Sequence, residues 1–495
     1  MLLRKRASRE HQISSHHTQH RGTDMMIPTF RRDLGSLGII LLALSVVSPG
    51  VSTLVVGASI VQGAGSAAPL AFMAGGALTL IFTFSQAELG SAFPLAGGDY
   101  ATIGNSLGSR AAFLQFTISL VGAVSLAAVC GLGISQYAQP LLPAVPPSVI
   151  AIASIATAGA LATLDIRTNT ALVGLFLVVE MAALALFASV GLLHVTQPLG
   201  VLGSGAVAFV ANRPTHVTAG MMAVAISAAS LATSGAGVAT NFSEEMRSPR
   251  SVGRLIMLIA LITVCSEILP VLGIVVGAKN LPEVLGSDAP FSAFLAEYAS
   301  PFLWTLLTLA IIAALFNALI ATLSSSGRLI FSSARDQIWS KTFNRHLLRL
   351  HPHWGSPWVA TLAVAAIGAA VSLVSFPLLI IVGAGSTMVQ WTLLNLALVV
   401  GRRRGLTGQP GCYRAPLFPL TPVLSFIGIA ALAAVGWQDK AVGRPGILIT
   451  VAMLAVGSLY YQFVLCRNGP WTVYSGDAQP GLAPVGAVLS PHGIP

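Results

Sequence analysis

Twelve apolar stretches, each about 17–25 residues long, follow one another along this chain. Of its 495 residues 55% are hydrophobic and only 8% are charged, whereas soluble domains carry about 25% charged residues. In a bilayer each backbone N–H and C=O must be paired within the protein, and segments of this length satisfy that requirement as helices. We therefore predict an all-α polytopic membrane protein with spans near residues 35–60, 68–92, 111–136, 148–165, 170–194, 218–241, 254–277, 302–325, 357–375, 378–400, 421–437 and 445–465.

Lys and Arg are distributed unevenly between alternate loops. With the N-terminus inside, the inner segments hold 22 of these residues and the outer segments hold 4. This excess is typical of cytoplasmic loops, and it predicts a multi-pass protein of the plasma (inner) membrane with both termini in the cytoplasm. The basic residues are spread over many loops, so the net charge of +10 gives no indication of nucleic-acid binding.

The two ends of the chain differ from its apolar body. Residues 1–30 are polar and lack the apolar stretch of a signal peptide, and residues 467–495 are rich in Gly and Pro. We expect both to be disordered tails, the first of them cytoplasmic, on either side of a membrane domain at 31–466. The four cysteines lack metal-binding spacing, and we expect neither a metal site nor a cofactor.

The sixth apolar stretch is interrupted in its middle. Ser234, Gly235, Ala236 and Gly237 follow Thr233 where the hydrocarbon core should be, and each interior glycine costs a helix roughly 1 kcal/mol relative to alanine. Broken backbone at membrane depth is tolerated only where protein buries it or where it lines a cavity. We predict that this break belongs to a transport site.

The first stretch has a second interruption at Ser48–Thr53. Pro49 lacks an N–H group and Gly50 is conformationally free, so the helix should break or kink here. A half-helix beginning there would present the N–H groups of Val51, Ser52 and Thr53, which suit a carboxylate. A simple proline kink is the alternative. Spans 1 and 6 lead two five-span halves, about 35–194 and 218–400, and an inverted repeat would bring the breaks face to face, with extra helices at 421–465.

Four motifs make this chain resemble the amino acid–polyamine–organocation permease family. In chain order they are AELGSAFPLAGGDY at 87–100, NFSEEMRSPR at 241–250, SGRLIFSSARD at 326–336 with Gly-Ser-Pro at 355–357, and YRAPLFP at 413–419. The resemblance covers about residues 30–465. It implies a transporter domain with a five-plus-five inverted repeat, broken helices 1 and 6, and transport of amino acids or amines by alternating access.

Two positions depart from the family pattern. Where relatives usually have Gly-small-Gly in span 1, this chain has Gly50-Val51-Ser52 and keeps only the first glycine. Where relatives often place an aromatic residue and then a glutamate in span 6, this chain has Ala236 and Gly237. The resemblance therefore leaves open which residue closes over the substrate.

Acidic side chains within the spans are few. A charge at mid-membrane costs about 2.5–3.5 kcal/mol, so such a residue is a functional candidate. Glu180 of span 5 is our candidate for a proton-coupling group or an electrostatic partner of the span 1 gap. The alternatives are a neutral, hydrogen-bonded packing residue and a residue nearer the interface. Glu267 of span 7 is a weaker candidate. Hydroxyls after Asn317 in span 8 leave a sodium site open. Glu244, Glu245 and Arg247, at the end of span 6, are candidates for a cytoplasmic gate.

The leading hypothesis is a secondary amino acid permease that works by proton-coupled symport or exchange. The substrate carboxylate would meet the N–H groups at Val51–Thr53, and its ammonium group the carbonyls at Ser234–Gly237. An amine or organocation permease, for ethanolamine or a polyamine, is the alternative within the fold, and a membrane sensor is the alternative outside transport. We expect no enzyme activity, membrane lipid as surroundings, and either a monomer or a homodimer.

Overall fold

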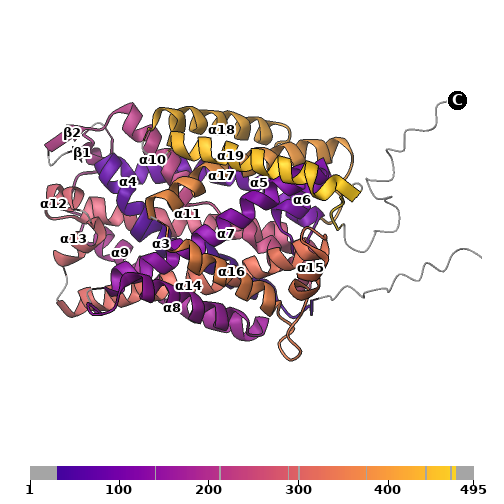
Figure 1. The fold of residues 1–495 in the computed structure, drawn as a ribbon. Coiled ribbons are helices and arrows are strands. Elements are labelled where there is room, and N and C mark those ends of the chain that lie inside the picture. The colour runs from indigo at the N-terminus through magenta and orange to yellow at the C-terminus, as the bar shows by residue number, and fades with distance from the viewer. Residues whose placement is uncertain are drawn as a thin grey trace, which may run out of the picture.

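The computed structural model describes residues 30–139, 141–203, 205–210, 213–287, 289–298, 301–374, 376–440, 443–468 and 471–474. Most of residues 1–30 and all of 475–495, which belong to the two predicted tails, lie outside this part of the chain. Nearly all the described residues form helices that run lengthwise through one bundle (Figure 1). The long helices are α5 (Ala68–Ala92), α7 (Ser109–Ala138), α8 (Pro147–Ala162), α9 (Ile166–Leu193), α10 (Ala219–Ala232), α11 (Val252–Gly277), α14 (Pro301–Arg335), α16 (Trp358–Val371), α17 (Phe376–Arg403), α18 (Leu420–Gln438) and α19 (Gly443–Phe463).

These helices confirm the predicted fold class. Within the described residues eight helical stretches are long and apolar enough to cross a membrane, and the first, Ser36–Ala92, contains both of the first two predicted spans. The main difference lies in span 8, which we expected to end at residue 325. Helix α14 continues to Arg335, because polar residues that leave the hydrocarbon can extend a helix against other protein.

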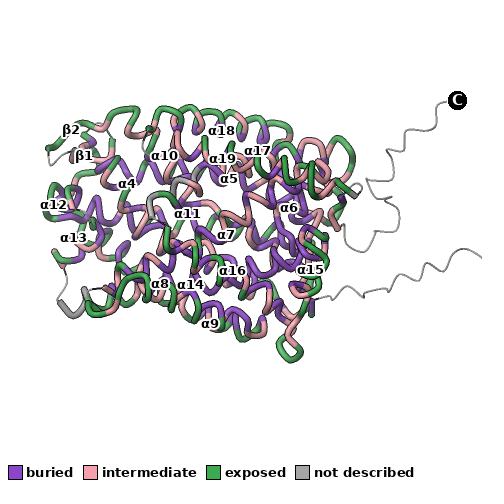
Figure 2. Tube along the Cα trace, viewed as in Figure 1, coloured by how far each residue is buried: buried purple, intermediate pink, exposed green. Residues whose placement is uncertain are grey.

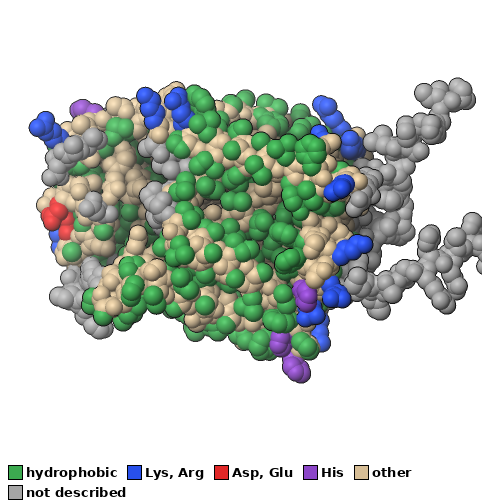
Figure 3. Space-filling view, in the orientation of Figure 1, with side chains coloured by type: hydrophobic (Ala, Val, Ile, Leu, Met, Phe, Trp, Pro, Cys, Tyr) green, Lys and Arg blue, Asp and Glu red, His purple; other side chains and the backbone are tan. Residues whose placement is uncertain are grey.

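The two ends of the bundle are built differently. One end, here called the hairpin face, carries the antiparallel strands β1 (Val207–Val210) and β2 (Arg213–His216) with the short helices α12 (Leu281–Gly286) and α13 (Pro290–Ala296). The other end, the terminal face, carries the described residues nearest both termini with α6 (Asp99–Leu107) and α15 (Lys341–Leu347) (Figure 1). Lys and Arg side chains gather near the terminal face, and hydrophobic side chains cover the middle of the molecule (Figure 3).

Small residues bring the central helices close together. A Cβ atom added to Gly75 of α5 would lie 2.6 Å from the Ser230 nitrogen of α10, and one added to Gly191 of α9 would lie 2.1 Å from the Gly273 oxygen of α11. Membrane helices pack in this way because lipid provides no hydrophobic force between them. The buried residues follow these contacts through the inside of the bundle (Figure 2).

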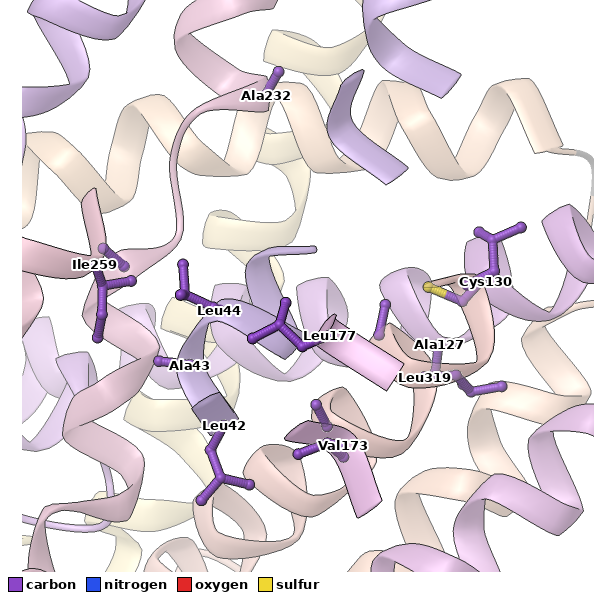
Figure 4. Packing of buried hydrophobic residues seen from close by; sticks show 14 of the residues in the cluster. Leu42, Ala43, Leu44, Ala127, Cys130, Val173, Leu177, Ala232, Ile259 and Leu319 are labelled. Atoms are coloured by element: carbon purple, nitrogen blue, oxygen red, sulfur yellow. The ribbon is translucent and has the colours of Figure 1, made fainter. Parts of the chain in front are cut away.

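Both predicted helix breaks are present. Helix α2 (Ser36–Val47) ends at Ser48, which has a left-handed φ of 47°, and the chain resumes as α3 (Pro49–Val51), a π-helix (Ser52–Val56) and α4 (Gly57–Ala64). Helix α10 ends at Ala232, Gly235 has a φ of 114°, and the 3₁₀ helix η4 (Ala236–Glu245) follows. Figure 4 shows the chain leaving α10 at Ala232 as a non-helical segment near buried residues of α2 and α11.

The two breaks are neighbours in space. A Cβ atom added to Gly235 would lie 3.2 Å from the Cγ2 atom of Val47, the residue just before the first break. The two breaks therefore lie side by side, and the inverted repeat from which we expected this stays a prediction.

Part of the predicted C-terminal tail is packed on the protein. Residues 471–474 lie against the terminal face, and Trp471 is buried. The structure differs here from the predicted disorder because this short segment carries two aromatic side chains that find partners on α7, α14 and α19.

Candidate functional site

The break in span 1 is occupied by a carboxyl group of the protein itself. Glu180 Oε1 accepts hydrogen bonds from the Gly50 N–H at 2.7 Å and from the Ser48 hydroxyl at 2.8 Å. Its other oxygen, Oε2, accepts one from the Asn317 amide at 3.3 Å. Glu180 is 2% exposed. Since the start of a helix carries partial positive charge, the half-helix that begins at Pro49 stabilises this carboxyl.

Gly50 makes the contact with Glu180 sterically feasible. A Cβ atom at Gly50 would lie 2.6 Å from Glu180 Cγ, closer than two carbon atoms can approach. The glycine thus gives α9 access to the break, where we expected Glu180 as an electrostatic partner.

Two further polar residues at the break are buried without a complete set of partners. Glu267 of α11 lies beside Ser52, its nearest polar neighbour, and within the described part of the chain neither of its carboxyl oxygens makes a hydrogen bond of regular geometry. The buried Thr53 hydroxyl likewise makes no hydrogen bond to the described residues. Buried polar groups without partners are rare in proteins, so these residues mark polar space around the half-helix.

The break in span 6 is held by a hydrogen bond to α5 and by one within its own segment. Thr79 and Thr233 share a hydroxyl–hydroxyl hydrogen bond of 2.9 Å, and the Ser234 hydroxyl donates to the Leu231 carbonyl at 2.7 Å. A Cβ atom at Gly237 would lie 1.8 Å from the Gln86 side chain, which therefore fills the space that a larger residue would occupy.

Gln86 belongs to a polar group that joins three helices. Its amide donates to both carboxyl oxygens of Asp99, at 3.0 and 2.8 Å, and Gln390 of α17 donates to the same carboxyl. Burial raises the pKa of Asp99, which lies at the start of α6 outside the spans. This group links the second half of span 6 to the terminal face.

The end of η4 is closed against α14 by a buried ion pair. Arg328 donates from Nε to Glu245 Oε2 at 2.7 Å and from Nη2 to Oε1 at 2.9 Å, and the two side chains are 2% and 5% exposed. Arg328 also donates to the Ser324 carbonyl at 2.7 Å and stacks over the Phe242 ring. A two-pronged pair with its remaining donors satisfied is among the stronger polar contacts in proteins.

A second ion pair lies beside the first. Arg335 donates to both carboxyl oxygens of Glu244, at 3.1 and 2.9 Å, and Glu244 also accepts from the Ala96 N–H at 2.8 Å. Next to it the Tyr100 hydroxyl donates to Asp336 at 2.9 Å. Burial raises the pKa of Asp336 to about 6.

The predicted gate acids are therefore paired, but with residues the sequence did not indicate. Arg247, the expected partner, is exposed; its backbone N–H donates to the Leu34 carbonyl, and its side chain makes none of the ion pairs found among the described residues. The actual partners are seven residues apart on α14, two helical turns on one face. A helix predicted to continue from span 8 to residue 335 would have indicated both arginines as partners of the gate acids.

Two broken helices at the centre of a polytopic bundle, with two neighbouring ion pairs at one end, are the architecture of a membrane transporter. A family model described as "Amino acid permease" matches residues 34–460. The chain therefore belongs to the amino acid permease family.

Individual relatives are distant but extend over most of the chain. The methylthioribose transporter of Bacillus subtilis (strain 168) is 24% identical, over 87% of this chain and 92% of that protein. The L-asparagine permease of Streptomyces coelicolor is 22% identical, over 79% and 82%. The human Asc-type amino acid transporter 1 is 25% identical, over 85% and 73%.

Proposed function

We propose that this protein is a secondary transporter that carries amino acids across the plasma membrane together with protons. The family and the names of two relatives, an L-asparagine permease and an Asc-type amino acid transporter, support an amino acid substrate. The excess of Lys and Arg in the loops at the terminal face supports a cytoplasmic location for that face. The closed gate there and the adjacent helix breaks support alternating access.

The observation that carries the proposal is the Glu180 carboxyl on the N–H of Gly50, at 2.7 Å. The N–H groups that follow it, at Val51–Thr53, are those we predict for the substrate carboxylate, although the Ser52 N–H already donates to the Ser48 carbonyl at 3.0 Å. A substrate carboxylate and Glu180 would therefore share one small region of positive potential at the start of the half-helix.

Two ionised carboxylates cannot share this region cheaply. At about 4 Å their repulsion is roughly 4 kcal/mol with the effective dielectric constant of about 20 that suits protein sites. Within the part of the chain that the structure describes, the hydrogen-bond partners of Glu180 are Ser48, Gly50 and Asn317, and none of them is Lys or Arg. Protonation of Glu180 removes the repulsion, so binding of the substrate carboxylate favours uptake of one proton. This is the thermodynamic requirement for symport.

The test is uptake into proteoliposomes that contain the purified protein. A panel of labelled amino acids, including asparagine and small neutral residues, is measured with and without an inward-directed proton gradient. Methylthioribose is added because one relative is named as its transporter. We expect at least one amino acid to accumulate and the gradient to stimulate its uptake. Uptake of no amino acid would refute the substrate class.

The coupling group is tested by Glu180→Gln, with Glu267→Gln as the matched change at the other buried glutamate. We expect Glu180→Gln to abolish stimulation by the proton gradient while exchange of substrate across the membrane continues. Glu267→Gln should keep the stimulation. Full pH-driven uptake by Glu180→Gln would overturn the assignment of Glu180 as the coupling group. If Glu267→Gln alone lost the stimulation, Glu267 would be the coupling group.

A further inference from the structure

Residues 471–474, here called the C-terminal strap, run across the terminal face beside the gate. The Trp471 indole N–H donates to the Asp336 carbonyl at 2.5 Å, and the Tyr474 N–H donates to Asp336 Oδ1 at 2.9 Å. The Trp471 ring is 7% exposed and meets Phe113 of α7 edge-on, with ring centroids 6.1 Å apart. The strap is therefore fixed to the end of α14 at two points and anchored by a buried aromatic ring.

The strap also contacts the arginine that closes the gate. The guanidinium carbon of Arg335 lies 4.1 Å from the centre of the Tyr474 ring, within the range of a cation–π interaction. The same guanidinium holds Glu244 of η4. Tyr474 thus restricts the rotamers of Arg335 to the geometry that the ion pair needs.

A third contact reaches the other side of the gate. Val473 packs on Gly104 of α6, where an added Cβ atom would lie 2.8 Å from Val473 Cγ2. Helix α6 follows the loop whose Ala96 N–H donates to Glu244. The strap consequently touches both α14 and α6, the helix that follows the loop bound to Glu244.

We propose that the C-terminal strap is a latch that stabilises the closed state of the gate at the terminal face. It orders Arg335, joins α6 to α14, and must be released or rearranged when η4 separates from α14. A tail that packs only by chance would contribute to overall stability and leave the gate equilibrium unchanged. The latch rests on the gate and the alternating access of the proposed function, but it depends on neither the substrate nor proton coupling.

Two truncated chains provide a matched test. One ends after Tyr474 and keeps the strap, and the other ends after Asn468 and removes it. Both carry Ser243→Cys as a reporter in a background in which the four native cysteines are replaced by serine. Ser243 is fully buried in η4 while the gate is closed, so the rate at which a soluble thiol reagent labels it in detergent reports opening.

We expect the chain without the strap to label about tenfold faster or more, since losing two hydrogen bonds and a cation–π contact shifts a two-state equilibrium by at least this factor. The chain ending after Tyr474 should label like the full-length reporter protein. Trp471→Phe, which removes the indole N–H and part of the ring but keeps an aromatic anchor, should lie between them. Melting temperature and size-exclusion profile identify any variant that fails to fold. If the chain without the strap fails to fold, the labelling rate of Trp471→Phe tests the latch instead. Equal labelling rates in the folded strap variants would overturn the latch, including when the melting temperature falls.

Discussion

The buried pair of Glu245 and Arg328 gives the sharpest prediction about the gate. In Glu245→Gln, Arg328 stays 2% exposed in the closed state but loses its counter-charge. Removing one partner of a buried ion pair costs about 3–5 kcal/mol. In the open state water reaches Arg328 and the cost largely disappears. The closed-to-open ratio should therefore fall by roughly 100-fold or more, because each 1.4 kcal/mol is a factor of ten.

The labelling rate of Ser243→Cys measures this shift. Arg167→Gln is the matched control because it removes the Asp33–Arg167 pair, whose side chains are 35% and 65% exposed. Such surface pairs contribute about 0–1 kcal/mol, and the control should label like the parent.

A double variant tests the electrostatic reason. Glu245→Leu with Arg328→Met leaves no buried charge without a partner, and apolar replacement of a whole buried pair is often neutral. It should label more slowly than Glu245→Gln. Equal rates for Glu245→Gln and Arg167→Gln in folded protein would refute the reasoning, and so would a double variant that opens as readily as the single one.

Three further predictions concern single positions. Gly50→Ala should strongly reduce uptake, because its Cβ would lie 2.6 Å from the Cγ of Glu180. Gly63→Ala, whose Cβ would have no atom within 4 Å, should transport normally. The measurement is uptake per amount of membrane-inserted protein. Gly235→Ala should cost roughly 1–2 kcal/mol and lower the melting temperature, because alanine is strained at a φ of 114°. The raised pKa of Asp336, about 6, means that the folded protein binds this proton more tightly than the unfolded chain, so its stability should increase as pH falls through about 6. Asp336→Asn should remove that increase, so the variant should gain more melting temperature over the parent at pH 7.5 than at pH 5. A larger gain at pH 5 would contradict the predicted direction of the pH dependence.

The sequence predicted the features that local chemistry determines. Apolar stretches of bilayer length gave the helices, and Pro49 and Gly235 marked the breaks, because each acts on its own backbone. It could not predict contacts between distant segments. Asn317 on Glu180, Arg328 on Glu245 and the C-terminal strap depend on side-chain directions across helices that lie far apart in the chain. We expected span 8 to end at residue 325, whereas α14 continues to Arg335. The apolar pattern indicates where the chain leaves the membrane and not where the helix ends.

The departures from the family pattern have physical reasons in the structure. Val51 has φ −66° and ψ −44° and Ser52 has φ −57° and ψ −45°, ordinary helical values that need no glycine. The left-handed residue of the break is Ser48, whose hydroxyl binds Glu180.

At the second break the missing side chain is replaced from another helix. Gly237 stands where relatives often have glutamate, and the Gln86 amide occupies the space that Gly237 leaves and binds the Asp99 carboxyl. Gly50 and Gly237 thus have the same use, since each lacks a Cβ atom where a polar side chain from α9 or α5 enters the break. A larger residue at either glycine would exclude that side chain, so the polar groups at both breaks depend on the two glycines as much as on Glu180 and Gln86 themselves.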